Sequence, residues 1–139
     1  MKNILIRILF FFAVTSFVFS CSTIKIDSAT RSIVYSGIHS GKTSMNYEIF
    51  FNSNNSFAIK KITVGDAIIE NYSIQNVESQ VFEDVKKNNF DSGNYKIMFK
   101  SFDISEEGKN NNVIIEVILK GKTKIISATV EEKKPIRRK

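Results

Sequence analysis

The stretch TSMNYEIFF, residues 43–51, predicts a β-strand with one face toward a core. Thr43, Met45, Tyr47, Ile49 and Phe51 share one face of an extended chain, because successive side chains point to opposite sides. The intervening positions are mostly polar. Such alternation is typical of a strand that packs on a core with one face and meets water with the other.

Short apolar runs separated by turn residues predict six further strands. Asn and Ser fill residues 52–56, and Gly65-Asp66 separates two apolar runs in the manner of a tight hairpin. The most apolar run is VIIEVIL, residues 113–119, and we expect both of its faces to be nearly covered. The six strands are expected over residues 32–38, 57–64, 67–73, 94–104, 113–119 and 124–130.

One segment follows a helical period. Val77, Val81 and Val85 recur every four residues, Asn76 can cap the start, and Lys86-Lys87 suit the negative end of a helix dipole. We therefore predict a short helix over residues 77–87 that lies across an opening of the sheet, with its valines inward.

The pattern as a whole predicts an all-β fold. About seven strands at short spacing, with one short helix, favour a single β-sandwich over residues 32–131, with an immunoglobulin-like or transthyretin-like arrangement. The cysteine pair and core tryptophan of antibody domains are missing. A small closed β-barrel is the alternative.

The first twenty residues have the order of a secretory signal. Lys2 and Arg7 precede an apolar run, ILFFFAVTSFVF at residues 8–19, which ends at the small residue Ser20. The run is too short to span a bilayer. Cys21, the only cysteine, follows at once.

Val18-Phe19-Ser20-Cys21 resembles the lipobox of bacterial lipoproteins. The resemblance implies that residues 1–20 are removed and that Cys21 carries a diacylglyceryl group and usually an amine-linked acyl chain such as palmitate, which anchors residues 21–31 as a lipidated tether. The composition is similar to that of small lipoproteins of the Bacteroidota, especially flavobacteria. In some of those bacteria acidic residues after the cysteine signal surface export. Residues 22–26 contain none, which favours an outer-membrane protein facing the periplasm. The alternative is an ordinary cleaved signal that leaves Cys21 as a free thiol.

The positive charge is concentrated at the two ends of the chain. The sequence has 20 basic and 14 acidic residues, a net charge of +6. Five basic residues lie in the last seven, so we expect 132–139 to be a disordered basic tail that could touch anionic lipid headgroups. The nearly neutral body argues against a nucleic-acid partner.

No motif indicates catalysis or a cofactor. The run GIHSGKT, residues 37–43, lacks the phosphate-loop spacing because Ser36 stands where the first glycine belongs, so we expect no nucleotide partner. His39 is the only histidine, which excludes a His-rich metal site, and no Gly-x-Ser-x-Gly elbow occurs. We therefore expect neither metal nor cofactor.

A few side chains have two interpretations. Glu83-Asp84 and Glu106-Glu107 are adjacent acidic pairs in polar surroundings. Glu116 lies inside the apolar run. If its face is buried, its charge needs a partner such as Lys124 across the hairpin, but we favour an outward-facing carboxylate in a cross-strand ion pair. Phe50 and Phe90 fit the alternation least and form either an exposed patch or a second buried face.

These observations favour a binding or scaffold module for another envelope protein, which is not an enzyme. The first alternative is a small carrier or sensor that holds an apolar ligand between its sheets. The second is an enzyme whose site is assembled from residues far apart in sequence.

Overall fold

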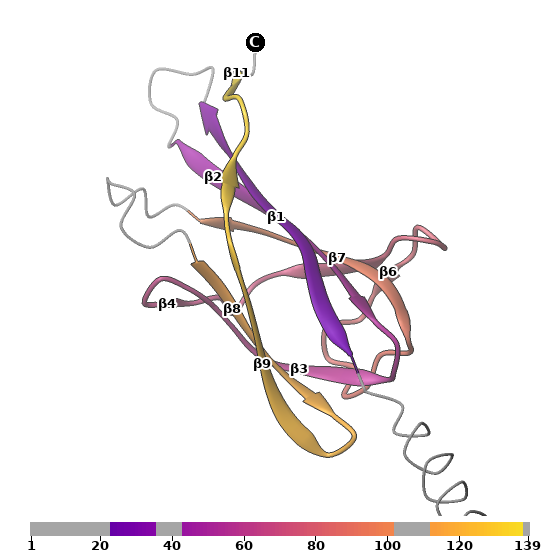
Figure 1. Ribbon diagram of the computed structural model, residues 1–139. Helices are drawn as coiled ribbons and strands as arrows, with labels where there is room; N and C mark the ends of the chain where they lie inside the picture. Colours follow the sequence, from indigo (N-terminus) through magenta and orange to yellow (C-terminus); the bar gives the residue numbers. More distant parts are fainter. Residues whose placement is uncertain (1–22, 36–42, 102–111, 138–139) are drawn as a thin grey trace, which may run out of the picture.

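The computed structural model describes residues 23–35, 43–101 and 112–137, and it contains strands arranged in two sheets (Figure 1). The order of the seven-stranded sheet is β10-β1-β2-β7-β5-β6, with β11 also paired to β1. The order of the four-stranded sheet is β4-β3-β8-β9. The strands are β1 (Ile24–Tyr35), β2 (Ser44–Ser53), β3 (Phe57–Val64), β4 (Ala67–Ile68), β5 (Ser73–Asn76), β6 (Phe82–Glu83), β7 (Gly93–Ser101), β8 (Asn112–Leu119), β9 (Lys122–Thr129), β10 (Glu131–Glu132) and β11 (Ile136–Arg137).

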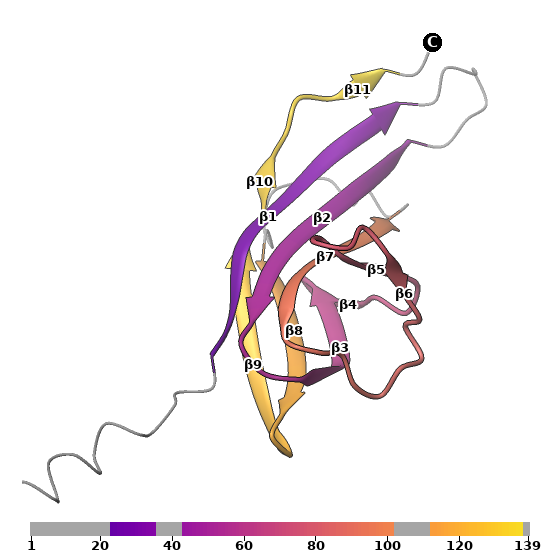
Figure 2. The same cartoon turned by 90° about the vertical axis from the view of Figure 1, so that its right-hand side faces the viewer.

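The predicted all-β class is confirmed, and the barrel alternative is wrong because neither sheet closes on itself. The two sheets lie in separate layers, which is consistent with a β-sandwich (Figure 2). Eleven strands replace the expected seven over the described ranges. The segment expected as one strand over residues 67–73 contributes only β4 and the start of β5.

The alternation in β2 sets which side of the larger sheet is buried. Tyr47, Ile49 and Phe51 are buried, as their spacing predicts. The register places them opposite Phe99, Ile97 and Tyr95 of the antiparallel neighbour β7, all of which are buried too. The buried side chains of β3 and β8 face them from the smaller sheet and complete one continuous core.

A cluster of four aromatic rings joins the two sheets. Phe57 of β3 packs against Phe51 and Tyr95 of the larger sheet and stacks on Phe90, with ring centroids 5.4, 5.2 and 5.3 Å away. Phe57 and Phe90 also exchange backbone hydrogen bonds of 2.9 and 2.7 Å between N and O. Phe90 is 2% exposed, so of the two interpretations given above the buried one holds for this residue.

The predicted helix over residues 77–87 is wrong. Asn76 Oδ1 does accept hydrogen bonds from the amides of Glu78 and Ser79, as a cap would, but the chain then reverses. Gln80 adopts a left-handed φ of 59°, and Asn76 N donates to Val81 O to lead into β6. The valines are β-branched and favour strand or turn geometry. Val81 and Val85 are exposed rather than inward.

The strands extend past both predicted domain boundaries. β1 begins at Ile24, where a tether was expected, and a bulge between Ile26 and Ser28 lets this long strand change which residues face the core. At the other end β10 and β11 pair in parallel with β1, where a disordered tail was expected. Lys133 N donates to Arg31 O at 2.8 Å, which fixes the start of that segment.

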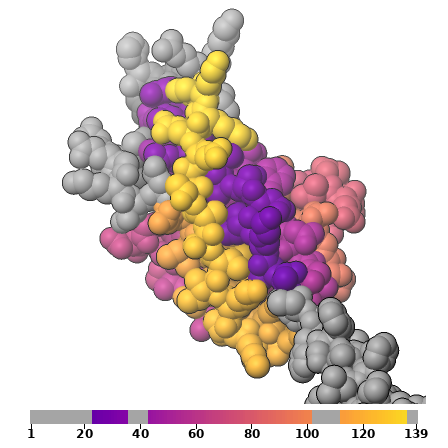
Figure 3. Space-filling view, viewed as in Figure 1, coloured from indigo at the N-terminus to yellow at the C-terminus, as the bar shows by residue number. Residues whose placement is uncertain are grey.

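The chain reaches β10 by crossing from the smaller sheet to the larger one. β9 ends beside β8, the buried Val130 follows, and β10 then lies against β1. Figure 3 shows this yellow C-terminal segment running alongside the indigo β1. The C-terminal segment therefore covers the edge of the larger sheet that β1 would otherwise leave open.

Tyr95 predicts how stability responds to alkaline pH. Burial raises the pKa of its hydroxyl, which donates to Asp91 O at 3.1 Å. The unfolded chain loses this proton near pH 10, whereas the folded chain holds it to higher pH. The free energy of unfolding should therefore fall as pH rises past about 10.

We expect Tyr95→Phe to reduce that alkaline fall, measured by urea denaturation at several pH values. At neutral pH the variant should lose about 1 kcal/mol with the hydrogen bond. An alkaline slope equal to that of the parent protein would contradict the assignment.

Candidate functional site

Several residues singled out from the sequence lie outside the described ranges. They are Cys21 with residues 1–20, residues 36–42 with His39, and the pair Glu106-Glu107. Their expected roles therefore stay predictions. Within the described ranges, no set of three or more His, Cys, Asp or Glu side chains could hold a metal ion. The same ranges contain no helix long and apolar enough to cross a membrane.

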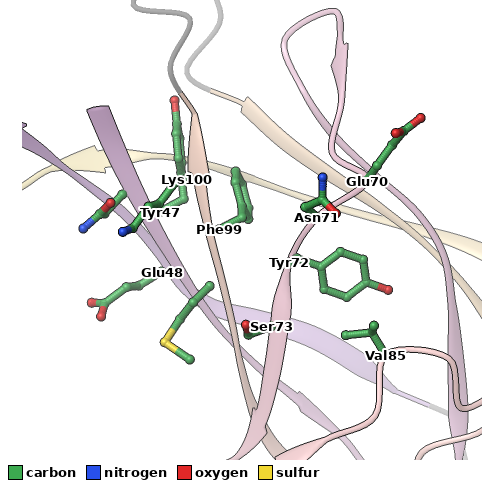
Figure 4. Close-up of a pocket in the computed structure, with 11 residues that line it drawn as sticks. Tyr47, Glu48, Glu70, Asn71, Tyr72, Ser73, Val85, Phe99 and Lys100 are labelled. Carbon is green, nitrogen blue, oxygen red and sulfur yellow. The ribbon is translucent and has the colours of Figure 1, made fainter. Parts of the chain in front are cut away.

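One open hollow of about 500 Å³ lies on the larger sheet. Its lining comes from β2, β7, the segment 70–73 and Val85, which follows β6. Figure 4 shows the β2 and β7 side chains on one side of the hollow and Glu70, Tyr72 and Val85 on the other. Because none of these residues belongs to the four-stranded sheet, the hollow does not lie between the sheets.

The hollow offers hydrogen-bonding groups rather than a nucleophile paired with a base. The Glu48 carboxylate is 3.1 Å from the ammonium of Lys133. The Tyr72 hydroxyl is a neutral donor at physiological pH, and burial raises its pKa further above the ordinary value. Asn46 Oδ1 is buried without a protein partner. Such groups suit a small polar molecule. No sequence pattern indicated Asn46 or Tyr72 as site residues, because only the pairing of strands far apart in the chain brings them together.

A second feature is the outer surface of the four-stranded sheet. We call it the isoleucine face, after Ile68, Ile114, Ile118 and Ile125, which are 59%, 37%, 39% and 65% exposed. Thr63 of β3 lies opposite both Ile114 of β8 and Ile68 of β4. Ile125, on the edge strand β9, lies opposite Glu116 of β8. The expectation that β8 is covered on both faces is therefore wrong.

The alternation within VIIEVIL carries the signal for this face. Val113, Ile115 and Val117 are almost fully buried, whereas Ile114 and Ile118 between them are exposed. Apolar residues on both faces of a strand suggest burial on both, but no strand of residues 23–35, 43–101 or 112–137 packs over the outer side of β8. Large apolar side chains grouped in this way on a surface are typical of a contact region.

Glu116 lies within the isoleucine face and is half-buried. The register places Ile125 and Lys61 opposite it, and Lys124 lies opposite the neighbouring Val117. Its carboxylate is 3.6 Å from the ammonium of Lys60 on β3. The predicted outward-facing, cross-strand ion pair is therefore confirmed, with Lys60 as the partner that the structure shows.

Glu83 and Phe50 also take structural roles. The Glu83 carboxylate accepts a hydrogen bond from the Lys87 ammonium at 2.6 Å, so the pair Glu83-Asp84 belongs to a turn on the edge of the larger sheet. The Phe50 ring lies 5.8 Å from the ammonium of Lys96 on the adjacent strand β7. Neither residue lines the hollow.

A scan of protein-family models and a search of curated proteins each give no match for this chain. The functional argument therefore depends on the molecule's own surfaces.

A matched pair of substitutions tests whether the isoleucine face is open. Ile115→Thr places a hydroxyl in the core and should cost about 2–3 kcal/mol in unfolding free energy, because it leaves a void and a polar group. Ile114→Thr, one residue away on the exposed side, should cost about 0.5 kcal/mol. Urea denaturation of both variants measures the difference. Equal losses would show that the face is covered in the folded protein.

Proposed function

We propose that this chain is a lipid-anchored binding module of the cell envelope, and that its isoleucine face binds another envelope protein from the periplasmic side of the outer membrane. The proposal takes the two-sheet domain as a β-sandwich of the immunoglobulin-like or transthyretin-like kind. The observation that carries it is the open isoleucine face, because exposed isoleucines grouped on β4, β8 and β9 have no role in the core.

The face has the composition of a protein interface. Its isoleucines flank Glu116, and Lys60 and Lys61 of β3 lie beside that carboxylate. The carboxylate of Glu116 is near one of these ammonium groups. A partner that offers apolar side chains to the isoleucines and carboxylates to Lys60 and Lys61 would complement this arrangement, since apolar burial gives affinity and charge complementarity gives orientation.

The carrier alternative has less support. Its ligand would occupy a space between the sheets, but the aromatic rings of Phe51, Phe57, Phe90 and Tyr95 fill the region where the sheets meet. The hollow in Figure 4 is open, polar in part and confined to one sheet. No observation favours an apolar ligand over a protein partner.

The anchor can be tested at one sulfur atom. Cys21→Ser removes the acceptor of the acyl chains and should move the protein from the membrane fraction to the soluble fraction. Fractionation of the producing cells, with mass spectrometry of the mature N-terminus, measures both location and acylation. Membrane association that persists in Cys21→Ser, or a mature chain without a fatty acid, would contradict the anchor.

The partner can be tested by site-specific photocrosslinking in living cells. A photoreactive residue at position 114, 118 or 125 should trap one and the same envelope protein, whereas residue 28 of β1, in the other sheet, should not trap it. Ile68→Glu, introduced beside the reactive residue, should abolish that crosslink because it places a carboxylate in the apolar contact. Equal capture at position 28, or capture that Ile68→Glu leaves unchanged, would refute this partner site.

A further inference from the structure

The two ends of the sandwich differ in which segments they hold. At one end the chain enters β1, and the β2–β3 turn and the β8–β9 hairpin lie beside that point. The views in Figures 1 and 2 agree that this hairpin points to the same end as the start of β1, whereas the C-terminus lies at the opposite end. We call the first of these the entry end.

Hydrogen bonds fix the chain at the entry end before β1 begins. Thr23 N donates to Asn54 Oδ1 at 2.8 Å, and Asn54 N donates to Thr23 O at 3.1 Å. Only Ser22 stands between Thr23 and Cys21. Two residues of extended chain reach roughly 7 Å, so a lipid on Cys21 leaves no room for a long tether.

The β2–β3 turn and the β8–β9 hairpin at the entry end carry no carboxylate. The β2–β3 turn supplies Asn55 and Ser56, the loop before β7 supplies Asn88 and Asn89, and the hairpin supplies Lys120; together they line a shallow hollow of about 410 Å³. Lys122 follows in the hairpin, and Lys25 lies opposite Asn52 near the start of β1. All three lysines are exposed. The nearest carboxylates in sequence, Asp27 and Asp91, lie on β1 and in the loop before β7 rather than in these turns.

We propose that the entry end docks directly on an anionic lipid surface through Lys25, Lys120 and Lys122, which orients the domain on its membrane. The inference rests on the proposed lipid anchor. The anchor holds the turns within about a Debye length of the headgroups, roughly 8–10 Å at physiological salt, where their attraction for lysine is only weakly screened. Each lysine near such a surface contributes about fivefold to the affinity.

This assignment replaces the C-terminal tail as the lipid contact. β11 pairs with the far part of β1, where Ile136 lies opposite Val34, and Lys133 is held by Glu48 of β2. Its described basic residues, Lys133, Lys134 and Arg137, therefore lie toward the end opposite the entry end. The hairpin lysines are closer to the headgroups although fewer in number.

The chain has no tryptophan, so a single introduced tryptophan reports one position. Thr123→Trp places the probe on an exposed site of the hairpin, and Tyr35→Trp places a matched aromatic probe at the opposite end of β1. Each full-length, acylated variant is reconstituted in vesicles whose lipid carries a nitroxide quencher on its headgroup. Flotation of the vesicles first shows whether the protein is anchored.

We expect strong quenching of the Thr123→Trp probe and weak quenching of the Tyr35→Trp probe on phosphatidylglycerol vesicles. Quenching of the Thr123→Trp probe should be weaker on phosphatidylcholine vesicles. Adding Lys120→Glu and Lys122→Glu should lower the docked-to-undocked ratio by roughly tenfold or more. Lys100→Glu with Lys134→Glu makes the same charge change away from the entry end and should leave quenching unchanged.

The possible failures are distinguishable. Protein that does not float with the vesicles contradicts the anchor, and the docking proposal falls with it. Protein that floats but shows equal quenching of both probes, or quenching insensitive to Lys120→Glu and Lys122→Glu, overturns the docking alone. The fluorescence of the Thr123→Trp probe could instead change with protein concentration and not with anionic lipid. That result would assign the surface to contact with a second copy of the chain and would also overturn the docking proposal.

Discussion

The packing of Phe57 against Phe51, Phe90 and Tyr95 is the contact on which the two-sheet arrangement depends. The strands of each sheet are joined by backbone hydrogen bonds, whereas the two sheets meet through packed side chains, and no strand of one sheet pairs with a strand of the other in the described residues. Phe57 has three aromatic partners at centroid distances below 5.5 Å and is 1% exposed. Its backbone pairs with Phe90, so the long loop before β7 is held in the same contact. The cluster is the aromatic part of one continuous core that covers the inner faces of both sheets.

The cluster also explains which parts of the fold could be predicted from the sequence. The alternation in residues 43–51 and 94–99 is local, and it placed the buried faces of β2 and β7 correctly because a side chain's direction in a strand depends only on its parity. Phe90 does not belong to a strand pattern, and its burial is set by a partner 33 positions away in the chain. For the same reason, the boundaries at residues 32 and 131 fell inside structure. The pairing of β1 with β10 and β11 is parallel and distant, and no local pattern announces it.

The valines of residues 77–87 show a different limit. A spacing of four residues fits a helix, and Asn76 makes the capping hydrogen bonds that such a helix needs. Four-residue spacing also arises, however, when a turn and a short edge strand happen to repeat an apolar residue. The left-handed Gln80 ends any helix before it completes a turn, and β6 then pairs with β5. Three regularly spaced valines cannot by themselves distinguish a helix from a turn followed by an edge strand. Burial of the valines would have supported a helix, but Val81 and Val85 are exposed.

The candidate surfaces follow from how the chain covers its own faces. The path through Val130 to β10 runs along the edge of β1, whereas no described strand packs over the outer side of β3, β8 and β9. Ile114 and Ile118 therefore meet water on the same strand whose inner residues are the most buried in the core. Because the entry of β1 lies at the hairpin end, an anchor at Cys21 would hold that end against the membrane. The strands that carry the isoleucine face would then rise away from the bilayer and present the face sideways. A partner in the envelope could reach it there without displacing lipid, so the short link before β1 would set the geometry of any encounter.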